Sequence, residues 1–304
     1  MTILGPTATT VVEVTGADRM DYLENVTTQR LLDVPVGEVR GAMYLDPHGG
    51  PVAVFDVAVL ADRLLLLVPD GELADRVVQV LGGRTFLSDA RFVRRDDAVV
   101  AVRGEGAGAV LEAAGLAGDR DAVEHDGVVV VARGGGADVV GDGAALEETL
   151  ARLEAAGAER VDGAALDDWA VAAGEPRWGR EIAAPHLPEE LGLLPTHVHL
   201  AKGCYPGQEA VARMWMLGRP RRRLARVVVD DGVAAGWGTG AGKRAVEVTA
   251  VAGGSGLAFV PADAEVGHRL EDETGRGVEV LGFVGGELPV PGHDPAMTRR
   301  RDRR

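Results

Sequence analysis

The chain has 304 residues, of which 46% are hydrophobic and 26% charged, so it can form a core and is not mainly disordered. This length exceeds that of a typical single domain and predicts two or three domains. The formal net charge of −15 argues against broad, non-specific binding to nucleic acids or membrane surfaces. We therefore expect no direct nucleic-acid partner and no membrane partner.

The first half of the chain alternates short apolar strands with short amphipathic helices. The expected strands are 9–14, 40–45, 52–60, 64–68, 99–103 and 128–132, and the expected helices are one that begins near 18, 70–81, 107–114 and 146–156. Residues 46–50, Asp-Pro-His-Gly-Gly, suit a tight turn and predict a hairpin. Strands interrupted by both helices and hairpins indicate an α+β fold with antiparallel sheets.

Residues 174–220 are different, because prolines break the chain repeatedly and Trp178, Tyr205 and Trp215 gather there in a chain with 4% aromatic residues. Long irregular segments that are rich in aromatic residues are more often functional than disordered, so we expect a site here. Beyond this region come short β-rich runs separated by glycine-rich turns: 224–230, 246–251, 257–260 and 278–283. Their spacing predicts a small closed or partly closed β-barrel.

This pattern divides the chain into three segments. Residues 1–219 are expected to form an α+β region of two subdomains, and residues 220–290 the C-terminal β-barrel. The arginine-rich end lacks apolar partners, which predicts a disordered basic tail over residues 291–304.

The cellular compartment follows from the cysteine content and from the hydropathy pattern. The longest nearly apolar stretch, residues 57–68, is interrupted by Asp62 and Arg63 and is too short for a membrane helix. The first residues lack the pattern of a signal peptide. A single cysteine, Cys204, allows no internal disulfide, as is typical of a reducing compartment. We expect a cytoplasmic protein.

Three other motifs have simpler explanations than ligand binding. Residues 104–109 match a loose dinucleotide pattern, but a hairpin turn follows at 125–127, which favours an ordinary strand-to-helix turn. Residues 238–243 lack the glycine and the Ser or Thr that a Walker motif needs. His197 and His199 could join Cys204 as metal ligands, but the spacing supplies no further ligand, so we expect no metal.

The most specific segment covers residues 202–209 and reads K-G-C-Y-P-G-Q-E. Pro206 and Gly207 suit the middle of a type II turn, and residues 208–214 can follow as a short helix. The thiol of Cys204 then lies near a helix N-terminus and two residues from Lys202, and both features favour a thiolate. The alternative is a buried, inert cysteine in a structural turn.

This octapeptide resembles the K-G-C-Y-x-G-Q-E motif of the YgfZ-type folate-binding proteins, which are relatives of the glycine-cleavage T-protein. Other segments are similar to further parts of that family: A-G-E-P-R-W-G at 173–179, L-D-P-H-G at 45–49, and the helix and turn that carry Tyr22, Leu23, Thr28 and Gln29. The similarity covers most of residues 10–225. The chain departs from common family residues at Ala170, Ala201 and Trp215-Met216, which affects individual ligand contacts.

The resemblance implies a T-protein-like folate-binding fold of α+β subdomains around a central channel, plus a C-terminal β-barrel. It implies tetrahydrofolate, or a one-carbon derivative of it, as cofactor. The implied function is a tetrahydrofolate-binding accessory protein that supports the assembly or maintenance of iron-sulfur enzymes, including ones that modify transfer RNA. The implied partners are folate and iron-sulfur enzymes or their assembly machinery, and Cys204, with Lys202 beside it, is the reactive group.

Candidate ligand contacts follow from the chemistry of folate. Aromatic side chains can stack on the flat pterin, amides and carboxylates can pair with its donor and acceptor edge, and guanidinium groups can bind the glutamate carboxylates. Side chains of these three kinds in the matched segments are Gln29, Trp178, Tyr205, Gln208, Glu209 and Arg213. The arginines at 221–223 are an equal candidate for the folate tail and for a solvated surface.

Two other functions remain open on the sequence. One is a folate-dependent aminomethyl or one-carbon transferase, an enzyme like the T-protein. That reaction needs a carboxylate to position a substrate amine, for which Asp96, Asp97 and Glu181 are candidates. The other is an interaction module that no longer binds a ligand.

Overall fold

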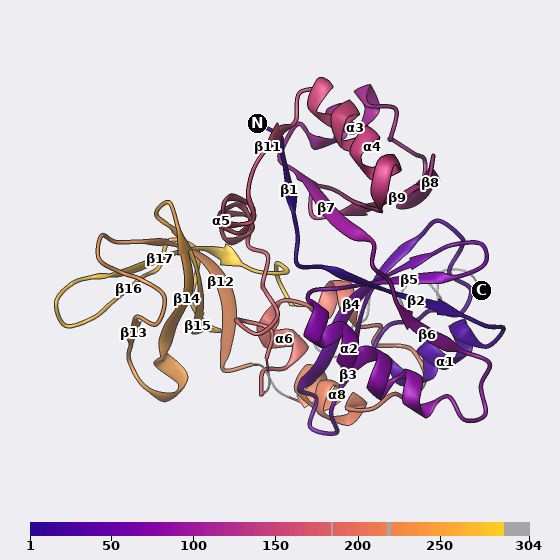
Figure 1. Cartoon of the computed structure of the whole chain (residues 1–304). Helices are drawn as coiled ribbons and strands as arrows, with labels where there is room; N and C mark the ends of the chain where they lie inside the picture. Colours follow the sequence, from indigo (N-terminus) through magenta and orange to yellow (C-terminus); the bar gives the residue numbers. More distant parts are fainter. Residues whose placement is uncertain (184, 218–219, 289–304) are drawn as a thin grey trace, which may run out of the picture. The chain divides into compact units, whose positions relative to one another are not determined.

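The computed structural model describes residues 1–183, 185–217 and 220–288, and it divides into two compact units (Figure 1). The first unit comprises Met1–Glu24, Leu31–Ala42 and Ala53–Leu166, and the second comprises Asn25–Arg30, Met43–Val52 and the chain from Asp167 onward. The predicted tail at 291–304 lies outside the described residues. The predicted boundary between residues 219 and 220 adjoins an undescribed position and stays a prediction.

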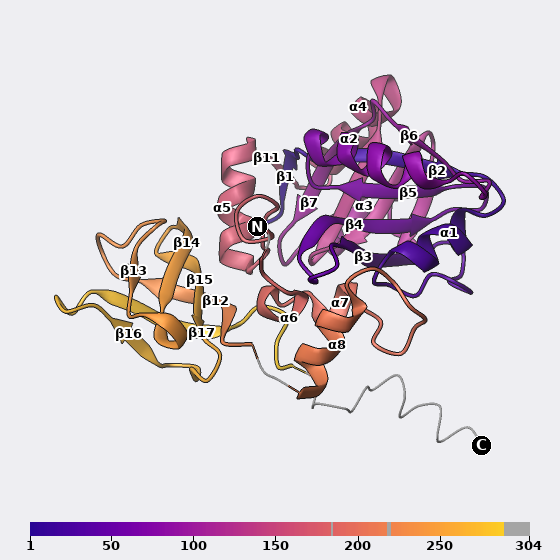
Figure 2. The ribbon, with the colours of Figure 1, turned by 90° about the horizontal axis from the view of Figure 1, so that it is seen from below.

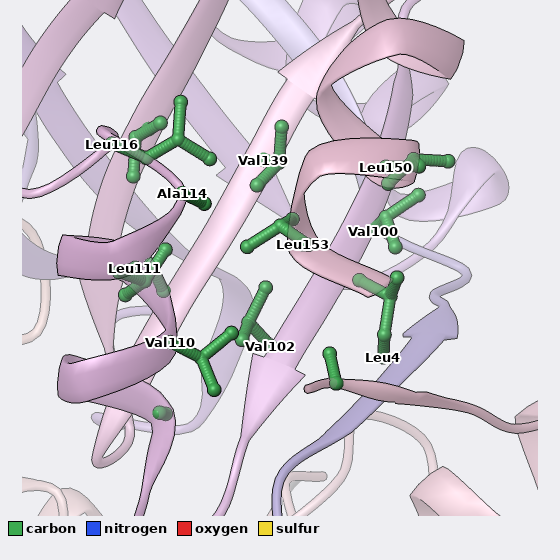
Figure 3. Close-up of a cluster of buried hydrophobic side chains, with 14 of the residues drawn as sticks. Leu4, Val100, Val102, Val110, Leu111, Ala114, Leu116, Val139, Leu150 and Leu153 are labelled. Carbon is green, nitrogen blue, oxygen red and sulfur yellow. The ribbon is translucent and has the colours of Figure 1, made fainter. Parts of the chain in front are cut away.

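One sheet of the first unit has the strand order β11-β1-β7-β10-β9-β8. Its strands are β1 (Ile3–Pro6), β7 (Ala98–Arg103), β8 (Ala122–His125), β9 (Val128–Arg133), β10 (Gly136–Gly141) and β11 (Glu159–Arg160). The pairs are antiparallel except for the short parallel pair of β1 with β11. Helices α3 (Ala107–Ala113) and α4 (Gly143–Ala155) pack their apolar side chains on this sheet (Figure 3).

A second sheet has the order β3-β4-β5-β2-β6. Its strands are β2 (Thr10–Thr15), β3 (Val39–Leu45), β4 (Pro51–Val59), β5 (Leu64–Val68) and β6 (Arg91–Arg94), and its helical segments are α1 (Arg19–Val26), α2 (Gly71–Val80) and the 3₁₀ turn η1 (Gly82–Arg84). The hairpin of β3 and β4 turns as predicted, with the Asp46 amide donating to the Gly50 carbonyl at 2.9 Å. The helix predicted over 70–81 is also confirmed, and Asp70 caps it, because its carboxylate accepts the Leu73 amide at 2.7 Å.

The core of the first unit lies on both faces of the β7, β9 and β10 layer. In β9, Val128 and Val130 belong to the cluster under α3 and α4, whereas Val129 and Val131 pack with Leu67 and its neighbours from the second sheet. Successive side chains of a strand point to opposite faces, so a strand buried on both sides reads as an unbroken apolar run. The predicted α+β fold with antiparallel sheets is confirmed.

The C-terminal sheet belongs to the second unit and has the order β13-β14-β15-β12-β17-β16. Its strands are β12 (Arg222–Val229), β13 (Gly238–Thr239), β14 (Val246–Ala252), β15 (Ser255–Pro261), β16 (Arg269–Glu271) and β17 (Gly277–Phe283), with the 3₁₀ turn η2 (Gly242–Arg244) before β14. The two edges approach each other, because the Thr239 hydroxyl donates to the Glu271 carbonyl at 3.3 Å. The sheet is therefore a nearly closed barrel around an apolar cluster, as predicted.

The described part of the proline-rich region 174–220, predicted to be irregular, holds two short helices in addition to the predicted one. These are α6 (Pro188–Leu191) and α7 (Leu194–His197), beside the predicted α8 (Gln208–Leu217), and a further helix, α5 (Gly163–Ala173), ends directly before the region. Figure 2 shows α6, α7 and α8 side by side, and α6 also packs on β12. Among the helices of the described residues, none is both long enough and apolar enough to cross a membrane.

Candidate functional site

The K-G-C-Y-P-G-Q-E segment forms the predicted turn and helix start. The Gln208 amide donates to the Tyr205 carbonyl at 3.2 Å, and Gly207 has a φ of 80°, which together are typical of a type II turn. Helix α8 begins directly after the turn. The prediction from Pro206 and Gly207 is confirmed.

The turn packs tightly on the tip of the hairpin at residues 43–52, which belongs to the same unit. A Cβ atom added at Gly207 would lie 2.5 Å from the Asp46 carbonyl oxygen and 2.8 Å from the Leu45 Cβ. A Cβ added at Gly49 would lie 3.0 Å from the Ala210 Cβ in α8. Glycines on both sides thus allow the L-D-P-H-G hairpin and the octapeptide to approach closely.

We expect Gly207→Ala to lower the free energy of unfolding by about 3 kcal/mol, because alanine would adopt an unfavourable positive φ and also overpack the turn. Gly179→Ala is the matched control, since Gly179 has a φ of 77° and no atom within 4 Å of an added Cβ. The control should lose only the conformational part, about 1–2 kcal/mol. Urea unfolding measures both variants, and equal losses would contradict the close packing of turn and hairpin.

Lys202 is buried and anchors the octapeptide to residues 27–29. Its Nζ donates to the Thr27 carbonyl at 2.6 Å and to the Gln29 carbonyl at 2.9 Å. The same ammonium lies 5.4 Å from the centre of the Tyr205 ring, within the range of a cation–π interaction. Lys202 therefore has a structural role in holding two segments together, and an effect of its charge on the Cys204 thiol stays a prediction.

Residues 27–29 are also bound to the segment that carries α7. The Thr28 hydroxyl donates to the His197 carbonyl at 2.6 Å, and the His199 amide donates to the Thr28 carbonyl at 2.9 Å. Gln29 is buried, with its Nε2 donating to the Thr196 carbonyl at 3.0 Å and its Oε1 accepting the Arg30 amide at 3.0 Å. The side-chain nitrogen of Gln29 therefore already binds residues 27–29 to the segment that carries α7, and its oxygen binds the next residue in the chain.

No metal-binding group is formed around the histidines. Within residues 1–183, 185–217 and 220–288, no three His, Cys, Asp or Glu side chains lie together in a way that could hold a metal ion. The His197 carbonyl and the His199 amide instead bind the backbone and side chain of Thr28.

Cys204 is exposed, whereas Lys202 and Tyr205 on either side of it are buried. The alternative of a buried cysteine therefore does not apply to this side chain. Because its neighbours are held in the interior, the thiol is presented from a turn with little freedom to move away.

The other predicted ligand residues differ in accessibility. Glu209 and Arg213 are exposed on α8 and form an ion pair at 3.0 Å, which contributes about 0.5 kcal/mol or less at such a site. Gln208 makes a long contact of 3.4 Å with the Gly203 carbonyl. Trp178 is half-buried and pairs with Ile182 in an isolated bridge. The structure thus brings Gln208, Glu209 and Arg213 onto one helix.

The arginine run at 221–223 is partly built into the barrel. Arg223 is buried, donates to the Gly286 carbonyl and lies 4.2 Å from the Phe283 ring centre. Burial lowers the pKa of its guanidinium. Arg222 pairs with Glu247 at 3.4 Å, and Arg221 is exposed.

Two of the three carboxylates suggested for a transferase, Glu181 and Asp97, already have partners. Glu181 is fully buried, and its two oxygens accept the Arg177 amide and the Arg180 Nε, each at 2.8 Å. Asp97 pairs with Arg95 at 3.0 Å in the first unit. Asp96 follows Arg95 in the same loop and is exposed.

The residue that sequence reasoning missed is Glu189 in α6. Its side chain is 1% exposed, and neither carboxylate oxygen has a hydrogen-bond partner among the described residues. Burial raises the pKa of Glu189 to about 8, and the neighbouring Glu190 adds to this rise. Burial also raises the pKa of Tyr205, with a contribution from the charge of Glu189. Strongly perturbed carboxyl groups of this kind mark candidate functional positions.

No sequence signal identifies Glu189, because Pro-Glu-Glu is an ordinary start of a solvated helix. The adjacent Glu190 follows that expectation, since its carboxylate accepts the Leu187 amide at 3.1 Å and lies 3.5 Å from the His186 Nδ1. Only the packing of α6 on its neighbours distinguishes the two residues.

No known protein-family model matches the chain. A segment of 104 residues is 33% identical to an aminomethyltransferase from Corynebacterium jeikeium (strain K411), covering 33% of this chain and 27% of that relative. This chain therefore spans about a quarter of the length of the curated relative it matches.

Among solved structures, the glycine cleavage system aminomethyltransferase T from Bartonella henselae matches over 95% of this chain and 86% of that chain. The TM-score is 0.77, with 19% sequence identity. A heterotetrameric sarcosine oxidase from Corynebacterium sp. U-96 matches over 51% of this chain with a TM-score of 0.34. The chain thus has the predicted T-protein-like fold, a mixture of helices and sheets with a nearly closed C-terminal barrel, and resembles aminomethyltransferases in both sequence and structure.

Proposed function

We propose that this protein is a cytoplasmic, tetrahydrofolate-binding accessory protein of the YgfZ type. It supports the assembly or maintenance of iron-sulfur enzymes, including ones that modify transfer RNA, through Cys204. Its partners are folate and those enzymes or their assembly machinery. The aminomethyltransferase fold supports the folate part of the proposal, and the octapeptide at 202–209 supports the accessory role.

The observation that carries the proposal is the way in which Cys204 is held at the surface. The thiol is exposed between two buried side chains, Lys202 and Tyr205, and directly before the tight turn that starts α8. A reactive group held by packed neighbours loses little conformational entropy when a partner approaches. This arrangement suits a cysteine that acts on, or is recognised by, another molecule.

The accessible members of the predicted ligand set fit tetrahydrofolate by chemical type. Trp178 offers part of an aromatic face, Gln208 an amide with only a long contact, and Arg213 an exposed guanidinium. These groups suit the pterin face, its donor and acceptor edge, and the glutamate carboxylates. Gln29 would first have to release the Thr196 carbonyl, and Glu209 and Arg213 would have to release each other.

The chain's own residues then have separate roles. Trp178, Gln208 and Arg213 would hold the folate, which supplies a one-carbon carrier when bound. Lys202 holds the octapeptide on residues 27–29, and the turn at Gly207 fixes the start of α8. Cys204 would meet the partner with its exposed sulfur atom as the nucleophile.

Isothermal titration calorimetry of the full chain with tetrahydrofolate tests the ligand. We expect saturable binding at one site, and weaker binding by Arg213→Ala because a charge-assisted contact is lost. Absence of heat with any reduced folate would contradict the proposal and favour an interaction module without a ligand.

We expect Cys204→Ser to keep the fold and tetrahydrofolate binding but to lose most of its support of iron-sulfur enzymes in cells that lack the wild-type protein. The hydroxyl replaces the thiol in size but is a much poorer nucleophile at neutral pH. The assay is the activity of a tRNA-modifying iron-sulfur enzyme. The control is Ser88→Ala, a substitution of similar size in the first unit, whereas Cys204 lies in the second. Full activity of the Cys204 variant would remove the thiol from the mechanism.

The second candidate is a folate-dependent aminomethyl or one-carbon transferase, favoured by the 33% identity with an aminomethyltransferase segment. It predicts formation of a one-carbon folate from tetrahydrofolate and an aminomethyl donor. In that case, turnover should survive Cys204→Ser, because the reaction needs a carboxylate rather than a thiol. Turnover by the purified chain would therefore favour the transferase over the accessory role.

A further inference from the structure

Glu189 lies in a helix of a single turn that is almost wholly buried. Pro188, Glu189 and Leu191 of α6 are buried, and the helix packs against α7, α8 and β12 within the second unit. A buried apolar residue at this position would need no explanation. A carboxyl group here has to be accommodated by its surroundings.

The surroundings compensate a negative charge only weakly. Both oxygens of Glu189 are buried without a hydrogen-bond partner of ordinary geometry among the described residues, and the residue's own backbone amide lowers the pKa of the carboxyl group by less than burial raises it. The two groups that interact with it electrostatically, Glu190 and Tyr205, are both acids. A carboxylate that is neither paired nor hydrogen-bonded is far more costly to bury than the neutral acid, so the group keeps its proton.

The elements around α6 carry other charged and titratable groups. They are His186 and Glu190 beside it in the chain, His197 at the end of α7, Lys202 and Tyr205 in the octapeptide, Glu209 and Arg213 on α8, and Arg222, Arg223 and Arg226 on β12. The cations have other contacts: Lys202 binds two carbonyls, Arg213 pairs with Glu209, Arg222 with Glu247, and Arg223 binds Gly286. The side chain of Arg226 lies beside Gly174, where an added Cβ would lie 2.6 Å from the Arg226 Cδ.

We propose that Glu189 is a proton-linked positioning residue, which keeps α6 packed against α8 and the octapeptide while it is protonated and loosens that packing when it ionises. The proposal goes beyond the proposed function and does not require folate binding. It concerns the regulation of how Cys204 is presented.

The consequence for the octapeptide follows from the connections already described. Tyr205 is buried within electrostatic reach of Glu189, and its neighbour Cys204 lies at the surface. When Glu189 loses its proton to solvent, the charge must reach water. Moving a one-turn helix is the least costly route, because short, local segments open at far lower free energy than the whole chain. The freed space then loosens Tyr205 and the start of α8.

Trp215 provides a reporter in α8, the helix that packs against α6. It is buried in α8, and its Nε1 has no hydrogen-bond acceptor among the described residues. Loosening of α8 from α6 exposes this indole to water, which changes its fluorescence. Trp215→Phe assigns the signal, since the chain has four tryptophans.

Hydrogen exchange of the full chain between pH 6.5 and 9.5 tests the proposal, with the rates corrected for the intrinsic effect of pH. Burial raises the pKa of Glu189 to about 8. The ionised fraction then rises about tenfold between pH 7 and pH 9. We expect exchange in peptides covering 186–192 and 202–216 to rise by up to this factor in the wild type, and to stay flat in Glu189→Gln.

Cysteine labelling gives a second reading of the same transition. The ratio of labelling rates of wild type to Glu189→Gln should be near one at pH 6.5 and should change with a midpoint near pH 8, because the intrinsic ionisation of the thiol cancels in the ratio. A constant ratio across this range, together with flat wild-type exchange, would overturn the proposal.

Glu190→Gln is the matched control in the same helix. Its glutamine can still accept the Leu187 amide, and it leaves Glu189 in place. Because the charge of Glu190 raises the pKa of Glu189, this variant should keep the transition and move it to lower pH. A transition that persists in Glu189→Gln assigns the effect to another group. Should Glu189→Gln fail to fold, the wild-type transition and its shift in Glu190→Gln decide the question.

Discussion

The variant Glu189→Gln is expected to gain stability over the wild type steadily as the pH rises. Burial raises the pKa of Glu189 from its ordinary value of 4.5 to about 8, so the folded chain holds this proton where the unfolded chain has lost it. The contribution of the protonated Glu189 to the free energy of unfolding is fully present below about pH 4.5. It is lost as the pH rises towards 8. Glutamine does not titrate and avoids this loss.

The expected change is about 1.4 kcal/mol per pH unit, or about 4 kcal/mol between pH 5 and pH 8, after which the two curves run parallel. Urea unfolding at a series of pH values measures this change as the difference in the free energy of unfolding between Glu189→Gln and the wild type. The contributions of all other titrating groups cancel in that difference. Glu190→Gln, whose carboxylate is partly exposed and hydrogen-bonded, should follow the wild type far more closely. A difference that does not vary with pH would show that Glu189 is ionised in the folded chain.

This result and the local opening of α6 are separable. The stability difference depends only on where the proton is held, whereas the exchange experiment asks which segment moves when it leaves. A pH-dependent stability difference with flat exchange in α6 and the octapeptide would support the buried acid but remove its link to Cys204. The two measurements therefore test successive steps of the same argument.

Lys202→Met is expected to lower the free energy of unfolding by about 4 kcal/mol. Methionine keeps much of the volume of the side chain but removes the donor to the Thr27 and Gln29 carbonyls. Each buried acceptor left without a partner costs about 1–3 kcal/mol. The cation–π contact with Tyr205 is lost as well.

The chain supplies its own control, because its only other lysine, Lys243, is exposed in the turn before β14. Lys243→Met should change the free energy of unfolding by no more than about 0.5 kcal/mol. Thermal or urea unfolding compares the two variants. Similar stabilities would mean that the ammonium of Lys202 is solvated in the folded chain and would contradict its role as an anchor.

The same experiment bears on the reactivity of Cys204. The sequence places Lys202 two residues from the thiol and assigns it an electrostatic role, whereas the structure has its ammonium bonded to two backbone carbonyls. If Lys202 acts mainly as an anchor, Lys202→Met should alter labelling of Cys204 through loosening of the segment. A pure charge effect would instead shift the pH dependence of labelling while leaving stability unchanged.

Local features of the fold could be predicted from the sequence. The Asp70 cap, the Pro206-Gly207 turn and the hairpin at 46–50 each depend on residues within a few positions of one another. Their side chains and backbone preferences act over that same short range. Helices α1 to α4 and most longer strands followed from periodicity, and α8 followed from the turn before it. Other elements were missed, most of them because a segment of two to four residues carries no period: α5, α6, α7, β1, β6, β8, β10, β11, β13 and β16.

The octapeptide was found because its eight residues are contiguous, and the class of fold followed from the same resemblance. The sequence by itself therefore determined the turn, the start of α8 and the position of the single thiol, since these depend on neighbouring residues. The tertiary structure alone decided which charges are buried. Lys202 binds carbonyls that lie 175 and 173 positions away, and Glu189 differs from Glu190 only in the face that α6 turns inward. Burial and electrostatic environment depend on distant segments, and they set the energetics of this site.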